Sequence, residues 1–140
     1  MSAVSLNPGT TFRGPLVAGL TGGVIAAVIN AVIYFAAQSV NGGPLLVQTP
    51  QALTPQPLTL FAVLLFSVAP GLLAGVVYWA LARFTRAPTR WFSILAGIVL
   101  GLFLVPPLVA ASGAITVWAL ELMHVGAAVP IVWTILKWRS

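Results

Sequence analysis

The chain lacks cysteine and aspartate, and Glu121 is the single acidic residue among its 140 residues. Without cysteine, it has no disulfide, no thiolate metal site and no cysteine nucleophile. Without aspartate, it has no Ser-His-Asp set, and it also lacks the G-x-S-x-G sequence of hydrolase nucleophiles. These absences lead us to expect a protein that is not an enzyme and that holds no cofactor.

Charged residues of either sign are scarce, since 5% of the chain is charged and 60% is hydrophobic, with a mean hydropathy of +1.09. A soluble domain has roughly 25% charged residues, so this composition indicates an integral membrane protein. The six cations all flank apolar runs: Arg13, Arg83, Arg86, Arg90, Lys137 and Arg139. This placement is typical of helix ends that face an anionic lipid surface. It differs from the clustered basic face of a nucleic-acid binder, so we expect the lipid bilayer, and no nucleic acid, as a partner.

Four long apolar runs occupy residues 15–38, 58–82, 91–110 and 114–136. Each approaches or exceeds the roughly 20 residues that cross the hydrocarbon layer as a helix. The runs are continuous and do not alternate with polar residues, which favours helices over the strands of a membrane barrel. The sequence therefore predicts an all-α fold, a bundle of four transmembrane helices in a single domain, 1–140.

The connectors between these runs indicate the orientation. The first and third connectors carry no charge, whereas the N-terminus, the middle connector and the C-terminus carry all the cations. Cytoplasmic segments of membrane proteins are enriched in lysine and arginine, so we expect both termini in the cytoplasm. Pro106-Pro107 is expected to bend the third span near its outer end, because proline removes a backbone donor.

Glycine pairs separated by four positions occur in three of the runs: Gly19 and Gly23, Gly71 and Gly75, and Gly97 and Gly101. Small residues at this spacing let transmembrane helices approach closely. We expect all three pairs to mediate contacts within the chain. At helical spacing Asn30 shares the face of the first pair and Ser67 that of the second, so both polar side chains should point into the bundle.

Glu121 and His124 lie inside the fourth apolar run, three positions apart. Ionisable groups inside a membrane are costly and usually face protein or a water-filled cavity. Asn30 and Ser67 are expected at a depth similar to that of Glu121, so the four side chains are candidates for one polar site in the outer half of the bilayer. The small residues of the fourth helix lie on the face opposite Glu121. We favour an arrangement in which Glu121 faces the bundle and the small face meets another subunit; the alternative is the reverse.

Several roles are open for this polar cluster. A neutral Glu121 bonded to His124 and Asn30 would only fix helix register, in a non-enzymatic accessory subunit or a small homo-oligomer; we favour this role. The alternative is a proton-coupled small-molecule transporter in which Glu121 and His124 relay a proton. An enzyme acting on lipid or quinone would need a lateral cavity near His124. A metal site is not expected, because Glu-x-x-His sites in helical bundles need further carboxylates.

A resemblance to a known family rests on residues spread over the chain: Asn30, Pro70-Gly71, Trp79-Ala80-Leu81, Trp91, Glu121 and His124. With these residues the chain resembles a family of short bacterial four-span membrane proteins whose domain has no known function. The resemblance implies the four-span fold and implies no activity. A bacterial member would lie in the cell (inner) membrane, as part of a homo-oligomer or a larger membrane complex.

Overall fold

The computed structural model describes residues 11–48 and 52–138. Its helices are α1 (Arg13–Asn41), α2 (Leu60–Phe84), α3 (Pro88–Phe103), α4 (Pro106–Ala110) and α5 (Ala114–Lys137). Within the described residues, four helical segments are long and apolar enough to cross a membrane, α3 and α4 together forming the third, Pro88–Ala110. The predicted all-α, four-span architecture is confirmed. The boundaries differ from the predicted runs by a few residues at most.

Proline and polar caps determine where these helices begin and end. The Thr59 side chain accepts a hydrogen bond of 3.2 Å from the backbone N–H of Ala62 and so caps the start of α2. Pro88 occupies the first turn of α3, where a missing N–H is tolerated. The third span is interrupted between Phe103 and Pro106, since the proline pair cannot continue the hydrogen bonding of α3. The predicted bend at Pro106-Pro107 is therefore confirmed.

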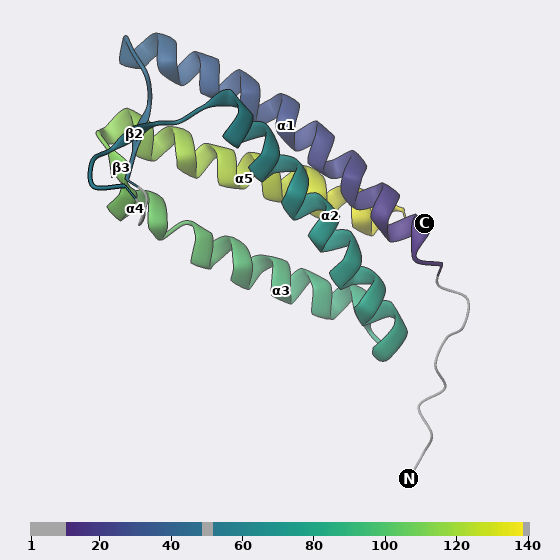
Figure 1. Cartoon of the computed structure of the whole chain (residues 1–140). Coiled ribbons are helices and arrows are strands. Elements are labelled where there is room, and N and C mark those ends of the chain that lie inside the picture. The colour runs from purple at the N-terminus through teal and green to yellow at the C-terminus, as the bar shows by residue number, and fades with distance from the viewer. Residues whose placement is uncertain (1–10, 49–51, 139–140) are drawn as a thin grey trace.

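Helix α1 lies against both α2 and α5, and α3 runs along the outside of this group (Figure 1). The start of α1, the connection from α2 to α3 and the end of α5 lie at one end of the molecule. At the other end lie α4 and the short strands (Figure 1). The described cations are thus gathered at one end, and Glu121 lies nearer the other.

A small antiparallel sheet closes this second end, which the sequence did not indicate. Its strands are β1 (Leu46–Val47), β2 (Gln56–Pro57) and β3 (Ala111–Ser112), in the order β2-β1-β3. Leu46 pairs with both Pro57 and Ser112, so the sheet joins the first connector to the third. Next to β1, Leu45 is fully buried in an apolar cluster with Tyr34, Val63, Ala119 and Met123. The sheet thereby fixes the beginning of α5 against α1 and α2.

Four of the expected glycines lie where α1 crosses α2. A Cβ added at Gly19 would overlap the carbonyl oxygen of Gly71, and one at Gly71 would overlap that of Gly19. A Cβ at Gly75 would lie 2.5 Å from the carbonyl oxygen of Pro15, and one at Gly23 would lie 3.0 Å from the backbone of Val68. The two backbones therefore touch, as the spacing predicted.

The third glycine pair makes no such contact, and our expectation for it is wrong. A Cβ at Gly97 or Gly101 would have no heavy atom of the described residues within 4 Å. The reason is the side of α3 that faces the bundle. Phe92 is the buried residue of this helix, and at about 100° per residue Gly97 and Gly101 lie about 140° and 180° around the helix from it.

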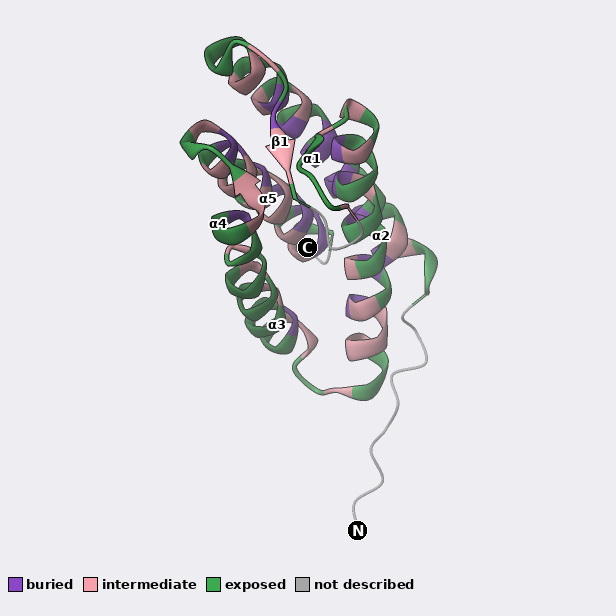
Figure 2. Ribbon diagram, turned by 60° about the vertical axis from the view of Figure 1, so that its left-hand side comes forward, coloured by how far each residue is buried: buried purple, intermediate pink, exposed green. Residues whose placement is uncertain are grey.

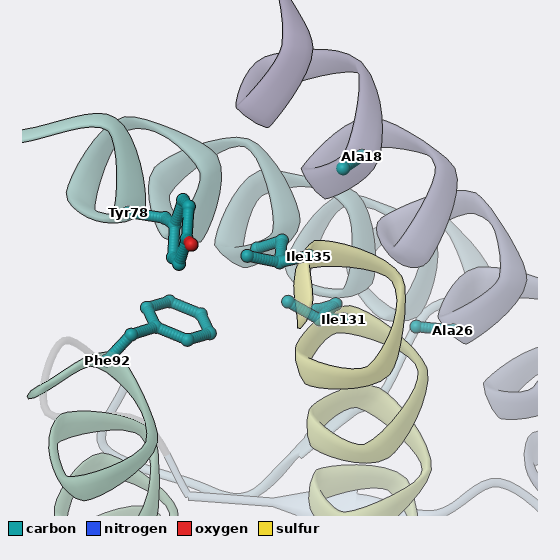
Figure 3. Close-up of a cluster of buried hydrophobic side chains, with 6 residues drawn as sticks. All are labelled: Ala18, Ala26, Tyr78, Phe92, Ile131 and Ile135. Carbon is teal, nitrogen blue, oxygen red and sulfur yellow. The ribbon is translucent and has the colours of Figure 1, made fainter. Parts of the chain in front are cut away.

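The contact of α3 with the rest of the molecule is small. Phe92 meets Tyr78 edge to face, with ring centroids 5.4 Å apart, in a buried cluster that also includes Ala18, Ile131 and Ile135 (Figure 3). In the most apolar part of the third span, 11% of the residues are buried, against 39% in α1. Figure 2 shows most of α3 as exposed. The third span is therefore the least buried of the four.

Candidate functional site

Asn30 and Ser67 form a buried polar pair between α1 and α2. Asn30 is 4% exposed, and its Nδ2 donates a hydrogen bond of 2.9 Å to the Ser67 hydroxyl. That hydroxyl donates in turn to the carbonyl oxygen of Val63, at 2.7 Å. Both donor groups are thus used inside the protein, at the level where glycines let the helices approach. This pair connects the two helices, as polar residues commonly do in membranes.

The small-residue face of α5 packs against the same region of α1. A Cβ added at Gly126 would lie 2.8 Å from the Asn30 Oδ1 and 3.2 Å from the side chain of Ile29. On this face Thr116 is fully buried and Ala119 is 3% exposed. We expected the small face of α5 to meet another subunit, and this expectation is wrong. Because α1 offers a flat, glycine-rich surface, the small residues of α5 pack against α1 within the chain.

Glu121 consequently points to the other side of α5, toward the third span. It lines a pocket of about 340 Å³ with Leu104, Leu108, Val117 and Trp118. The pocket is open to the outside of the bundle, since Leu108 is 63% exposed and Trp118 is 69% exposed. The Glu121 Oε1 is buried and has no hydrogen-bond partner among the described residues. Within the described residues, Glu121 therefore places in an apolar pocket a carboxyl group whose Oε1 has no hydrogen-bond partner.

His124 lies one turn further along α5 and makes its contacts with groups other than Glu121. Its Nδ1 is 2.6 Å from the carbonyl oxygen of Leu120, a contact that requires the proton on Nδ1. Its ring stacks on Phe103, with centroids 6.1 Å apart and an angle of 29° between the planes. His124 thus helps to hold the end of α3 against α5.

The predicted polar cluster is therefore divided into two places. Asn30 and Ser67 lie between α1 and α2, whereas Glu121 and His124 face the third span. The interpretation that Glu121 bonds to His124 and Asn30 to fix helix register is wrong. Asn30 donates to Ser67, His124 contacts Leu120, and the Glu121 Oε1 is without a partner in the described part of the chain.

Sequence reasoning missed the apolar residues of the pocket. Leu104 and Leu108 flank the proline pair at which the third span is interrupted, and the break leaves room beside Glu121. The proline pair was the available signal, because a bend close to an ionisable residue in the next helix is where a pocket can form. Trp118, which the sequence analysis did not single out, also forms part of the pocket wall.

The cation-rich end pairs its charges with aromatic rings. The Arg83 guanidinium lies 5.9 Å from the centre of the Trp79 ring, and the Lys137 ammonium lies 4.6 Å from that of Trp133. Such pairs are common where helices leave the hydrocarbon for the interface. Arg139, the last of the six predicted flanking cations, lies outside the described residues.

Comparison with protein families matches residues 10–139 to DUF6069, a family of unknown function. The match covers nearly the whole chain, so the chain belongs to this family. Comparison with curated proteins and with solved structures gave no match. The family match agrees with the resemblance drawn from Asn30, Glu121 and His124, and it assigns no activity to them.

Proposed function

We propose that this member of the DUF6069 family is a non-enzymatic protein of the bacterial cell membrane that acts as a small homo-oligomer, with both termini in the cytoplasm. One observation carries the proposal: Gly97 and Gly101 have the spacing of a close-packing pair and lie on the outer face of α3, where the described chain supplies nothing to pack against them. The helix that would fill this place is the α3 of a second copy.

The α1–α2 contact within the chain supports this interpretation of the α3 face. There, Gly19 and Gly71 bring two backbones into contact. Gly97 and Gly101 have the same spacing on a helix with little buried surface. Two copies related by a twofold axis would present identical faces to each other, so one self-complementary patch suffices. The buried Asn30–Ser67 pair then has a structural role, since it holds the subunit together behind this face.

Disulfide cross-linking in native membranes tests the proposal, because the chain has no cysteine of its own. Gly97→Cys and Gly101→Cys should each give disulfide-linked dimers on mild oxidation. Leu95→Cys is the matched control: Leu95 is also exposed on α3, but it lies about 140° around the helix from the glycine face. Equal cross-linking at all three positions, or none, would contradict association through this face.

A bulky residue at the same place provides a second measurement. Gly101→Ile should raise the dissociation constant of the dimer at least tenfold, because the helices could no longer approach closely. Single-molecule photobleaching of labelled protein in lipid vesicles counts the subunits directly. A cross-link to a larger, different protein would instead identify an accessory subunit of another complex.

Proton-coupled transport of a small molecule is the second candidate, and the open pocket at Glu121 favours it. A carboxyl group that has no partner in the protein is free to take up and release a proton or a substrate. In proteoliposomes, this function predicts proton flux or substrate uptake that Glu121→Gln abolishes. If the intact, folded protein shows neither proton flux nor uptake, transport is excluded and the proposal of a homo-oligomer remains.

A further inference from the structure

Among the described residues, no lysine or arginine lies close to Glu121. The nearest lysine or arginine along its own helix, Lys137, lies about 24 Å away at about 1.5 Å per residue. On the third span, Arg90 lies about 21 Å from Leu104 by the same measure. Of the described residues, His124 is the ionisable group nearest to Glu121 along α5, and its Nδ1 and ring contact Leu120 and Phe103. The described chain therefore leaves the carboxyl group without a charge partner.

A second copy of the chain does not supply that partner either. A copy inserted in the same orientation carries its described arginines and Lys137 at the same end as the first copy does, which is the end away from Glu121. A divalent metal ion fits poorly, because the described residues contain no group of three or more metal-ligating side chains. A small organic group from outside the protein can supply the partner that these sources do not.

The apolar side chains that line the pocket indicate what the rest of such a ligand would look like. Leu104, Leu108 and Val117 are aliphatic, and Trp118 offers an aromatic surface of the kind that attracts organic cations. A volume of about 340 Å³ is at the lower end of the roughly 300–1,000 Å³ of small-molecule sites. The opening between Leu108 and Trp118 leads to the outer surface of the bundle, from which an amphiphilic molecule in the lipid can enter.

From the lone carboxyl group, the apolar wall and the lateral opening, we propose that this pocket binds a small amphiphilic amine, whose ammonium group pairs with Glu121 and whose apolar body lies against Leu104, Leu108 and Trp118. Binding does not require association through α3 or transport, so its test is independent of those proposals.

The test is a set of matched probes measured on the whole protein in dodecyl maltoside micelles. The probes share one apolar body: 4-phenylbutylamine, 4-phenylbutanol and 4-phenylbutyrate. Equilibrium dialysis against empty micelles removes the contribution of partitioning into detergent. We expect the amine to bind at least tenfold more tightly than the alcohol, and the carboxylate to bind least. Equal binding of the amine and the alcohol would overturn the proposal without any variant.

Substitutions then locate the site. Glu121→Gln keeps the size of the side chain and should weaken binding of the amine at least tenfold, while leaving the alcohol unchanged. Glu121→Asp should retain a preference for the amine. Trp118→Leu should weaken binding, whereas Trp133→Leu at the other end of α5 should not. Undiminished amine binding by a folded Glu121→Gln protein would refute the assignment.

The ammonium group could belong to a lipid headgroup or to a free amine. A competition experiment distinguishes these two sources. Phosphatidylethanolamine added to the micelles displaces the phenylbutylamine if the natural ligand is a lipid headgroup. A free amine is indicated if the lipid does not compete while 2-phenylethylamine does. Displacement by phosphatidylglycerol, which lacks an amine, would overturn the charge argument.

Discussion

The contact between α1 and α2 gives the sharpest prediction, because one chemical change should have opposite effects at two glycines. Gly71→Ala adds a methyl group that would overlap the carbonyl oxygen of Gly19 and lie 2.9 Å from the Cα of Gly23. Both neighbours are backbone atoms, so no side chain can rotate away. The same substitution at Gly97 adds a methyl group that meets no heavy atom of another described helix within 4 Å.

The magnitudes follow from packing and helix propensity. Carbon atoms pack best about 3.5–4.0 Å apart, so Gly71→Ala would force α1 and α2 apart by roughly 1 Å. Overpacking of this kind costs about 1–3 kcal/mol. Alanine is favoured over glycine in a helix by up to about 1 kcal/mol. We expect Gly71→Ala to lower the free energy of unfolding by about 1–2 kcal/mol and Gly97→Ala to raise it by about 0.5–1 kcal/mol.

Unfolding of the monomer in mixed micelles of dodecyl maltoside and dodecyl sulfate, followed by circular dichroism, measures both values. Dilute protein keeps the Gly97 face unoccupied, so that oligomer formation does not contribute. Gly22→Ala offers a third value, since its Cβ would overlap the Thr134 hydroxyl and lie 2.7 Å from the Cα of Ile131; it should also destabilise. If Gly71→Ala proved as stable as Gly97→Ala, the described α1–α2 contact would be wrong.

Three further predictions concern the polar pair, the third span and the orientation. Asn30→Leu and Ser67→Ala should be coupled in a double-mutant cycle by about 0.6 kcal/mol, the average for hydrogen bonds within membrane proteins, and additive effects would exclude the bond. Phe92→Ala should speed hydrogen exchange in α3 more than in α1, since Phe92 is the buried residue of α3; uniform acceleration would argue against this anchoring role. A membrane-impermeant maleimide should label Leu53→Cys in spheroplasts, in which the outer face of the membrane is accessible, but label Ala87→Cys only after lysis. The opposite labelling would reverse the orientation.

Local features of the sequence were sufficient for the number and approximate limits of the spans. An apolar run in lipid must bond its own backbone groups, so length and hydropathy almost determine that it forms a helix. The break at Pro106-Pro107 was also local, since a missing donor acts within its own turn. The short strands were not predictable in this way, because two residues are too few for any periodicity.

The glycine pairs show where local information ends. Gly71 with Gly75 and Gly97 with Gly101 have the same spacing, yet only the first pair meets another helix within the described chain. Spacing places small residues on one face of a helix. Which face turns inward depends on the neighbouring helices, and Phe92 with Tyr78 sets this for α3.

The sequence by itself determined that Glu121 lies inside a membrane-spanning helix, opposite a face of small residues. Only the tertiary structure decided which of these faces meets the bundle. Both faces of α5 can be buried, and the choice depends on the close fit of Gly126 beside Asn30 on α1. That fit is made by residues almost a hundred positions apart in the chain. Because helix packing in lipid depends on close van der Waals approach across such distances, no local pattern in α5 could place Glu121 in its pocket.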